Sequence, residues 1–400
     1  MPPFYFLNPE QYPHFSGFFF VHDPRTVSRR ELMSNSAELP RVLIFRLSSL
    51  GDLILCSSAI SALARLKPSA KVDWVVGSDF SDILKTDSRL HRVIPFDRSL
   101  GFSEWHSLCR SLFESNYDQV FDLHGSLRTN YAMLYFQLRR LLTGRGMIPW
   151  HRLAKTRIRR FGFFIFKALW PQKFRPSARG GVARRAAALS GGEAVDHPNL
   201  SHFIDTQPSK RIEERLRSLR EDPRGFIAVM PGSAWPGKRW PVSHWLSALE
   251  MVGVPVAILG GRQDPECFEL ESALSRSSIS FVSFFRDSSL QDSAQVISMA
   301  KLIVANDTGL VHLAEAIGKS AVVIFGPTHP DLGFGPWRAK SQSLGSSLWC
   351  RPCSKDGTAC FRGGANRYLC MKLLKPEAVA ESVKSALTLV DEPVVARPRQ

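Results

Sequence analysis

Residues 302–328 read LIVANDTGLVHLAEAIGKSAVVIFGPT, and this stretch decides the fold. Its first four residues and residues 321–325 are short apolar runs, which are typical of strands buried in a parallel sheet. Between these runs apolar residues recur at helical spacing up to a closing glycine, namely Leu310, Leu313, Ala314, Ile317 and Gly318. The stretch therefore predicts a strand, a tight turn, a helix and a second strand, which together form one βαβ unit.

The turn at 306–309 carries the polar groups of this unit. It lies where a strand ends and a helix begins, and the unpaired N–H groups and partial positive charge of a helix amino end favour a phosphate. Gly309 lets the backbone approach a ligand, Asp307 can accept hydrogen bonds from sugar hydroxyls, and Thr308 can donate one to a phosphate oxygen. The alternative is that Asp307 or Thr308 only caps the helix and that His312, one turn later, only packs.

The positive charge of the chain is concentrated in one segment. The chain of 400 residues is 44% hydrophobic and 22% charged, which is typical of a globular protein with two or three domains. Of the net charge of +16, residues 128–185 supply +15, since they hold fifteen Lys or Arg and no Asp or Glu. Such a patch predicts an anionic partner, which could be a membrane, a nucleic acid or a polyanionic substrate.

The amino-terminal residues contain no recognisable targeting signal. Residues 1–40 lack a basic start followed by a long apolar core, and we expect them to form a flexible extension. The apolar stretch at 161–170 is interrupted by Lys167 and is too short to cross a bilayer. We therefore expect a cytoplasmic protein whose seven cysteines are reduced.

Two series of alternating strands and helices predict an α/β protein. In the first series we expect strands at 41–47, 72–76, 92–96 and 119–123 and helices at 53–66, 79–85 and 103–114. In the second we expect strands at 226–230 and 254–259 before the opening stretch, and helices at 209–219, 242–251, 265–274, 289–300 and 378–390. This order predicts two Rossmann-like domains, 41–205 and 206–400, with an interdomain cleft at the carboxyl ends of both sheets.

The basic segment contains two further amphipathic stretches. Tyr131, Leu134, Leu138 and Leu141 recur at helical spacing, and residues 157–170 interleave Arg and Lys with Phe and Trp. Cations can pair with anionic lipid headgroups, and aromatic side chains prefer the membrane interface. The pattern therefore favours a membrane surface as the partner of this segment. The alternative is a solvated basic face around an acidic substrate.

A second polar loop, 231–241, reads PGSAWPGKRWP and follows the first strand of the second series. Lys238 is a compact charge suited to a diphosphate, and Trp235 could stack on a base or a sugar. The loop is not a Walker motif, and it could be purely structural. However, it lies at the same sheet edge as the 306–309 turn, so the two can converge on one ligand.

Asp52 ends the corresponding turn of the first series, after Ser48, Ser49 and Gly51. Gly51 frees the backbone there, and the helix amino end favours the ionised carboxylate. A carboxylate at this place can act as a general base toward a hydroxyl from across the cleft. The alternative is that Asp52 only caps the helix and has no catalytic role.

Four cysteines cluster near the carboxyl end, at Cys350, Cys353, Cys360 and Cys370. A structural zinc site needs four ligands held by short knuckles, and only one Cys-x2-Cys pair is present. Zinc, a disulfide and reduced packing cysteines all remain open. The other three cysteines fall in expected helices and are interpreted as core residues: Cys56, Cys109 and Cys267.

Three motifs together resemble a known family. They are RLSSLGDLIL at 46–55, PGSAWPGKRWP at 231–241, and NDTGLVHLA followed by FGPT within 306–328. In this order they resemble the lipopolysaccharide heptosyltransferases, the ADP-heptose-dependent glycosyltransferase family 9, over about residues 41–385. The second and third motifs look closest to heptosyltransferase II.

The resemblance implies a GT-B fold and an inverting sugar transfer that needs neither metal nor other cofactor. By position in the motifs, Asp52 would be the catalytic base. The donor diphosphate would be bound by Lys238, Ser233, Thr308 and Gly309, and the donor sugar by Asp307 and His312. On the acceptor side the resemblance points to Ser49, Gly51 and Arg128.

The function that we expect is transfer of heptose, or a related sugar, from a nucleotide diphosphate to an anionic lipid-linked saccharide such as the lipopolysaccharide core. The enzyme would be peripheral at the inner face of the cytoplasmic membrane. One rival is a GT-B-type nucleotide-sugar epimerase, which needs no acceptor. A second, a zinc-stabilised nucleic-acid-binding protein, leaves both polar loops unexplained, so we expect no nucleic acid partner.

Overall fold

The structure is a computed structural model that describes residues 39–154, 156–169, 171, 181–193, 196–204, 209–358 and 360–391. The expected extension at 1–40 lies, up to residue 38, outside the described residues. Contacts join Leu39–Gln400 into one compact unit. The division into two domains after residue 205 therefore stays a prediction.

The first series forms a parallel sheet in the order β3-β2-β1-β4-β5. Its strands are β1 (Arg41–Phe45), β2 (Lys71–Gly77), β3 (Arg92–Phe96), β4 (Gln119–Asp122) and β5 (Trp150–Arg152). The first four confirm the prediction. The edge strand β5 was not predicted, because three residues with one His and one Arg form no apolar run.

The helices of this half differ from the prediction at three places, which are 53–66, 79–85 and 181–189. The helices are α1 (Leu50–Cys56), α2 (Ser58–Leu66), α3 (Asp82–Lys85), α4 (Phe102–Glu114), α5 (Leu127–Leu142), α6 (Arg157–Phe166) and α7 (Gly181–Leu189). The helix expected at 53–66 is two helices that meet at Ser57. The Ser57 hydroxyl donates to the Ile54 carbonyl at 2.7 Å and that of Ser58 to the Leu55 carbonyl at 3.0 Å, and such bonds compete with the helical ladder.

The second series forms a parallel sheet in the order β11-β10-β9-β6-β7-β8. Its strands are β6 (Ile227–Met230), β7 (Val256–Ile258), β8 (Phe281–Ser283), β9 (Leu302–Asn306), β10 (Ala321–Ile324) and β11 (Gln342–Leu344). Its helices are α8 (Lys210–Arg220), α9 (Val242–Val252), α10 (Pro265–Leu274), α11 (Leu290–Met299), α12 (Gly309–Ala316), α13 (Leu369–Lys372) and α14 (Pro376–Asp391). The βαβ unit of the opening stretch is β9-α12-β10, and Gly318 follows α12 with a φ of +107°, as a helix-ending glycine does.

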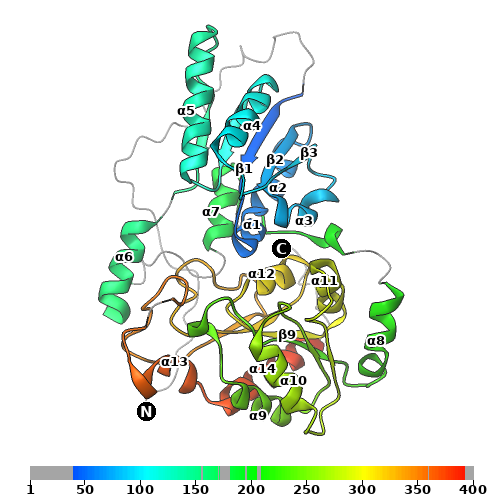
Figure 1. The fold of residues 1–400 in the computed structure, drawn as a ribbon. Coiled ribbons are helices and arrows are strands. Elements are labelled where there is room, and N and C mark those ends of the chain that lie inside the picture. The colour runs from blue at the N-terminus through cyan, green and yellow to red at the C-terminus, as the bar shows by residue number, and fades with distance from the viewer. Residues whose placement is uncertain are drawn as a thin grey trace, which may run out of the picture. The chain divides into compact units, whose positions relative to one another are not determined.

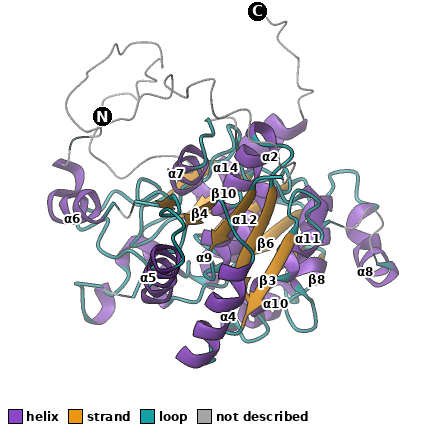
Figure 2. Ribbon diagram, turned by 90° about the horizontal axis from the view of Figure 1, so that it is seen from above, coloured by secondary structure: helices purple, strands orange, loops and turns teal. Residues whose placement is uncertain are grey.

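Helices lie around the strands (Figure 2), and alternating strand side chains divide the core into layers. In β1, Val42 and Ile44 pack with α1, α2 and α7, whereas Leu43 and Phe45 pack with α4 and α5 on the other face. In β6, Ala228 faces α8, α11 and α12, and Ile227 faces α9, α10 and α14. Because both faces of each strand are buried, the strands are continuous apolar runs.

The two sheets are connected through one continuous core. The apolar cluster that contains α1, α2 and α7 also contains α8, α11 and α12. The helices α1 and α12 lie against each other (Figure 1). A Cβ placed on Gly309 would lie 3.2 Å from the backbone nitrogen of Gly51. The turns that carry Asp52 and Asp307 are therefore brought together by two glycines in contact.

The leucine stripe of α5 faces outward. Leu134, Leu138 and Leu141 are exposed, while Ala132 and Phe136 on the same helix are buried against the first sheet. The helix itself confirms the prediction. Within the described part of the chain, no helix is long and apolar enough to cross a membrane.

Candidate functional site

A cavity of about 940 Å³ lies where the turns of the two sheets meet. The first half contributes the turn before α1, with Ser49, Gly51 and Asp52. The second half contributes the loop 231–241 and the turn 306–309. The predicted convergence of these three segments is thus present in one cavity.

Asp52 is held by two partners in the cavity wall. Its Oδ2 atom lies 2.7 Å from Nη2 of the buried Arg46 and accepts a hydrogen bond from the Ser49 hydroxyl at 3.1 Å. The Nη1 atom of Arg46 also donates to the Leu123 carbonyl at 2.5 Å. No side chain caps α1, so the reading of Asp52 as a simple helix cap has no support in the geometry.

Asp307 and Lys238 form an ion pair at the start of α12. Lys238 Nζ lies 2.7 Å from Asp307 Oδ2, and the Thr328 hydroxyl donates to the same oxygen at 2.9 Å. Both Asp307 and Thr328 are buried. The ion pair links the loop 231–241 to the βαβ turn, so the two predicted phosphate segments form one unit.

Three buried polar atoms near the amino end of α12 have no hydrogen-bond partner among the described residues. They are Asn306 Oδ1, Thr308 Oγ1 and His312 Nδ1. Thr308 occupies the N-cap position of α12, but its side chain makes no capping bond. Because buried polar groups are normally paired, atoms left unpaired beside a cavity indicate a ligand that supplies the missing bonds.

Burial keeps the imidazole of His312 neutral. Burial lowers the pKa of His312 to about 4, an effect that Lys238 reinforces and that Asp307 and Asp52 partly oppose. The ring stacks on Trp337 with centroids 6.0 Å apart. A neutral imidazole can exchange hydrogen bonds with a sugar or phosphate without adding charge.

The loop 231–241 is held in place by Arg239, and other side chains of the loop line the cavity. The Arg239 guanidinium donates to the Ser233 carbonyl at 2.8 Å and to Glu266 at 3.0 Å, so Arg239 holds the loop rather than a ligand. Ser233, Trp235 and Lys238 line the cavity. Trp235 is 42% exposed, which leaves a ring face available for stacking.

One predicted acceptor-side residue lies elsewhere. The Arg128 guanidinium donates to the carbonyls of Arg98 and Leu100 and lies over the Phe96 ring, and Arg128 is not among the described residues that line the cavity. Its role toward the acceptor stays a prediction. The structure adds lining residues that we had not assigned: Arg46, Arg160, Arg185 and Lys355. Arg46 is the first residue of the quoted 46–55 motif, and this position could have identified it as a site residue.

The four clustered cysteines are free thiols. Burial is the main cause that raises the pKa of Cys353 to about 11, and the neighbouring Cys370, Cys350 and Cys360 raise it further. In the described ranges, no group of three or more His, Cys, Asp or Glu side chains is placed to hold a metal ion. The segment between them packs on the donor loop, since a Cβ on Gly357 would lie 2.9 Å from Lys238 Cγ.

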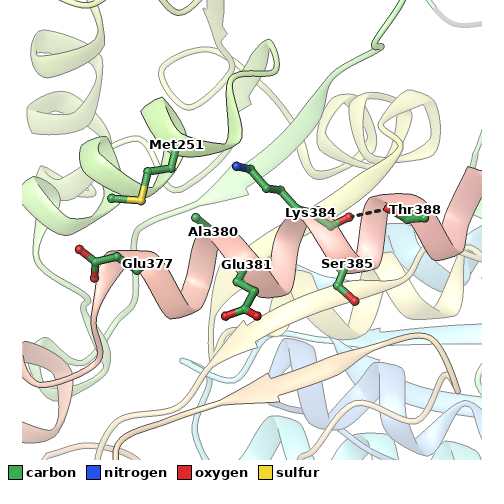
Figure 3. A pocket seen from close by; sticks show the side chains of 7 residues that line it. All are labelled: Met251, Glu377, Ala380, Glu381, Lys384, Ser385 and Thr388. Carbon is green, nitrogen blue, oxygen red and sulfur yellow. Dashed lines mark hydrogen bonds between the residues drawn. The ribbon is translucent and has the colours of Figure 1, made fainter.

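Figure 3 shows a second, smaller hollow of about 490 Å³ between Met251 at the end of α9 and the helix α14. Its polar side chains include Glu377, Glu381 and Lys384, and the Thr388 hydroxyl donates to the Lys384 carbonyl at 3.1 Å. None of these residues belongs to the three motifs. We assign this hollow no ligand.

Two parallel α/β sheets with polar turns that meet in one cavity are the architecture of the GT-B fold. The structure of an E. coli ADP-heptose lipopolysaccharide heptosyltransferase II matches with a TM-score of 0.61 and 22% identity, over 88% of this chain and 100% of that one. A family 9 glycosyltransferase from Veillonella parvula matches with a TM-score of 0.64 and 18% identity, over 89% and 100%. These likenesses confirm the predicted fold class.

The chain belongs to glycosyltransferase family 9. Residues 150–360, more than half of the chain, match the model described as glycosyltransferase family 9 (heptosyltransferase). Lipopolysaccharide heptosyltransferase 1 of Pseudomonas aeruginosa is 28% identical over 372 residues, 87% of this chain and 98% of that protein. Lipopolysaccharide heptosyltransferase 2 of Salmonella typhimurium is 23% identical over 306 residues, 73% and 84%. Since enzymes of both types match, the closer likeness to heptosyltransferase II stays a prediction.

Proposed function

We propose that this enzyme transfers heptose from an ADP-linked donor to the saccharide core of a lipopolysaccharide, with inversion at the anomeric carbon. The named relatives are lipopolysaccharide heptosyltransferases that span most of the chain. The observation that carries the proposal is the placement of Asp52 and the Lys238–Asp307 pair in one cavity. A direct displacement requires a base and a diphosphate site within one cavity.

In the proposed reaction an acceptor hydroxyl attacks the anomeric carbon from the face opposite the diphosphate. A glycosidic C–O bond forms, the bond from the anomeric carbon to the diphosphate oxygen breaks, and the hydroxyl proton passes to Asp52. Arg46 and Ser49 hold the Asp52 carboxylate in position. Lys238 and the amino end of α12 at Gly309 offset the charge that grows on the leaving diphosphate.

The donor sugar is proposed to lie against Asp307 and His312. The unpaired Thr308 hydroxyl and the Ser233 side chain are available for phosphate oxygens beside it. On the acceptor side, Ser49 and Gly51 form the wall next to Asp52. In this scheme the acceptor half is 41–205 and the donor half is 206–400.

The enzyme is further proposed to work as a peripheral protein at the inner face of the cytoplasmic membrane. Support comes from α6, where the apolar side chains Ile158 and Ile165 are exposed next to the exposed cation Arg159. Apolar groups and cations on one surface helix favour an anionic bilayer. Arg160 and Lys167 do not belong to this surface, since Arg160 lines the cavity and Lys167 donates to the Phe164 and Pro352 carbonyls.

A direct test combines donor binding with a transfer assay. ADP-heptose should raise the thermal unfolding midpoint of the protein more than other nucleotide sugars do, because a ligand that binds the native state stabilises it. With a lipopolysaccharide core acceptor, the product should carry one additional heptose and ADP should be released. A nucleotide-sugar product formed without acceptor would show an epimerase instead, and no shift with any nucleotide sugar would refute the proposal.

A further inference from the structure

A short turn from the carboxyl-terminal part of the chain reaches the cavity. Lys355 and Asp356 lie on this turn, residues 353–358, and both line the cavity together with Trp235 and Lys238. The turn belongs to none of the three motifs that carry the family resemblance. Neither Lys355 nor Asp356 has a role in the reaction proposed above.

The turn is attached to the segment that follows β10, beside the carboxylate of Asp307. The N–H groups of Cys353 and Ser354 both donate to the Pro327 carbonyl, at 3.0 and 3.3 Å. The next residue along the chain, Thr328, donates its hydroxyl to Asp307 Oδ2 at 2.9 Å. Two consecutive residues, Pro327 and Thr328, therefore hold both the turn and the carboxylate that is proposed to bind the donor sugar.

The turn also packs directly against the loop 231–241. A Cβ on Gly357 would lie 2.9 Å from Lys238 Cγ and 3.4 Å from Trp235 Cβ. A Cβ on Gly237 would lie 2.5 Å from the Gly357 carbonyl oxygen. Gly357 has a φ of +91°, which side chains disfavour. Glycines at both positions therefore allow the turn to lie close to the donor loop and to form part of the same cavity wall.

Hydrogen bonds within the turn hold the Asp356 carboxylate by one of its two oxygens. Oδ1 accepts from the Thr358 hydroxyl at 2.7 Å, from the Thr358 N–H at 3.2 Å and from the Ser354 hydroxyl at 3.0 Å. Ser354 is buried, and its hydroxyl also accepts from the Gly357 N–H at 2.9 Å. Since these bonds end on Oδ1, they fix the orientation of the carboxylate and leave Oδ2 for a group in the cavity.

Asp356 differs from the two other carboxylates that line the cavity. Asp52 and Asp307 each pair with a cation at 2.7 Å. Asp356 forms no ion pair with any residue that the structure describes. Burial raises the pKa of Asp356, but the bonds from Thr358 and Ser354 outweigh burial and hold this pKa below its ordinary value. An ionised carboxylate only accepts hydrogen bonds, so its free oxygen fits a donor such as a hydroxyl.

We propose that Asp356 binds hydroxyl groups of the donor sugar. This inference rests on the proposed function and adds to it a substrate-binding residue from outside the three motifs. A diphosphate is not the partner, because two anions at close range repel each other. The donor sugar is favoured over the acceptor, because the turn is attached to the donor loop and to the segment that holds Asp307. A carboxylate that bonds to a substrate hydroxyl disfavours a ligand without it, since its oxygen is then desolvated and unpaired.

The test is calorimetry of ADP-heptose and of ADP with the wild type and Asp356→Asn, without acceptor. Asparagine keeps one oxygen for the bonds within the turn, but it loses the negative charge and has an NH₂ group in place of the second oxygen. We expect the Kd for ADP-heptose to rise roughly 10- to 100-fold, as for a lost charge-assisted bond. The Kd for ADP should not rise, since ADP has no sugar, and this retained binding shows that the variant is folded. Equal weakening of both ligands would overturn the proposal.

Two control variants separate sugar binding from other effects. Thr358 is exposed and does not line the cavity, but its hydroxyl donates to Asp356. If Asp356 only kept the turn in shape, Thr358→Val would weaken ADP-heptose binding as much as Asp356→Asn does, and that result would refute the proposal. Glu381 is an exposed carboxylate on α14, so Glu381→Gln matches the change in net charge and should bind both ligands as the wild type does.

A transfer assay adds a kinetic readout. The sugar contact is present before and during the reaction, so Asp356→Asn should raise the KM for ADP-heptose by about the same factor as the Kd and change kcat less. If the wild type transfers no heptose to a lipopolysaccharide core, the proposed function fails, while calorimetry still decides whether Asp356 binds the sugar. If transfer is normal but Asp356→Asn binds ADP-heptose as the wild type does, only the inference about Asp356 fails.

Discussion

The contact between Gly51 and His312 permits a prediction whose size follows from the structure. A Cβ on Gly51 would lie 2.9 Å from His312 Cδ2 and 3.4 Å from the Gly309 Cα. Favourable contacts between carbon atoms need about 3.5–4.0 Å, so Gly51→Ala forces the two turns apart or displaces the imidazole. Overpacking of this kind costs about 1–3 kcal/mol.

That cost falls on the arrangement in which the acceptor and donor turns touch. If turnover requires this arrangement, kcat should fall about 5- to 150-fold, since each 1.36 kcal/mol is a factor of ten in rate. The Kd for ADP, measured by calorimetry, should change less, because Lys238 and Thr308 are not displaced by a methyl group on α1. Gly146→Ala is the control, since nothing lies within 4 Å of a Cβ there.

A double-mutant cycle separates this clash from a general loss of stability. In the His312→Ala background the ring is absent, so adding Gly51→Ala should cost little more than His312→Ala alone. Wild-type kcat in Gly51→Ala, or additive losses in the double variant, would refute the reasoning that the two turns must touch during turnover.

Three further predictions follow from the same cavity. Asp52→Asn should lower kcat by roughly 10²–10⁴-fold in a transfer assay while calorimetry shows unchanged donor binding, as for loss of a positioned general base; unchanged turnover would exclude Asp52 from the mechanism. Lys238→Ala should weaken ADP binding and slow transfer, because a charged contact to the diphosphate is lost; calorimetry that shows equal affinity for ADP would remove Lys238 from the donor site. Since the pKa of His312 falls from 6.5 to about 4 on folding, the native state binds fewer protons than the unfolded state between these values. The free energy of unfolding should therefore decline by about 3 kcal/mol at most as pH falls through this window. In urea titrations at pH 7 and pH 4.5, His312→Gln should lose less stability than the wild type, and equal losses would contradict the assignment.

The surface of α6 that is proposed to face the membrane gives a prediction of the same kind, with Ile158→Ser/Ile165→Ser as the perturbation. Both side chains are exposed, so the exchange should leave the fold and the turnover of a water-soluble acceptor unchanged. Co-sedimentation with anionic vesicles should weaken markedly, because two apolar groups no longer enter the interface. Undiminished sedimentation would mean that α6 does not dock the enzyme.

The sequence predicted the donor side of the site well because its groups lie on turns. Asp307 and Thr308 directly follow β9, Lys238 lies in the loop after β6, and the carboxyl ends of parallel strands meet at one edge of a sheet whatever the details of packing. Short side chains on such turns stay near the backbone that positions them. Their convergence could therefore be inferred before any coordinates were known.

Arg46, Arg160 and Arg185 could not be placed in this way. Each has a long side chain that reaches the cavity from a strand or helix, and direction depends on packing that periodicity does not encode. Counting fifteen cations in 128–185 identified the basic segment, but a count cannot distinguish the roles of the individual side chains. In the structure, Arg152 pairs with Asp122 at 2.9 Å, Arg128 binds backbone carbonyls, and Arg160 and Arg185 line the cavity.

Three of the four edge strands were missed for a related reason. The strands β5, β8 and β11 have three residues each and are only partly buried or exposed. An edge strand is covered on fewer sides than a central one, so its sequence needs no continuous apolar run. The central strands β1, β6, β9 and β10 are the ones whose composition determined the prediction.

The charges of the cavity are arranged so that Asp52 and Lys238 already have partners before a substrate binds. Arg46 pairs with Asp52, and Lys238 pairs with Asp307, each at 2.7 Å. A guanidinium in contact with a carboxylate holds that carboxylate oriented, which a general base needs. A lysine shared with a carboxylate attracts a diphosphate less strongly than an isolated one, which favours release of the product once the sugar has been transferred.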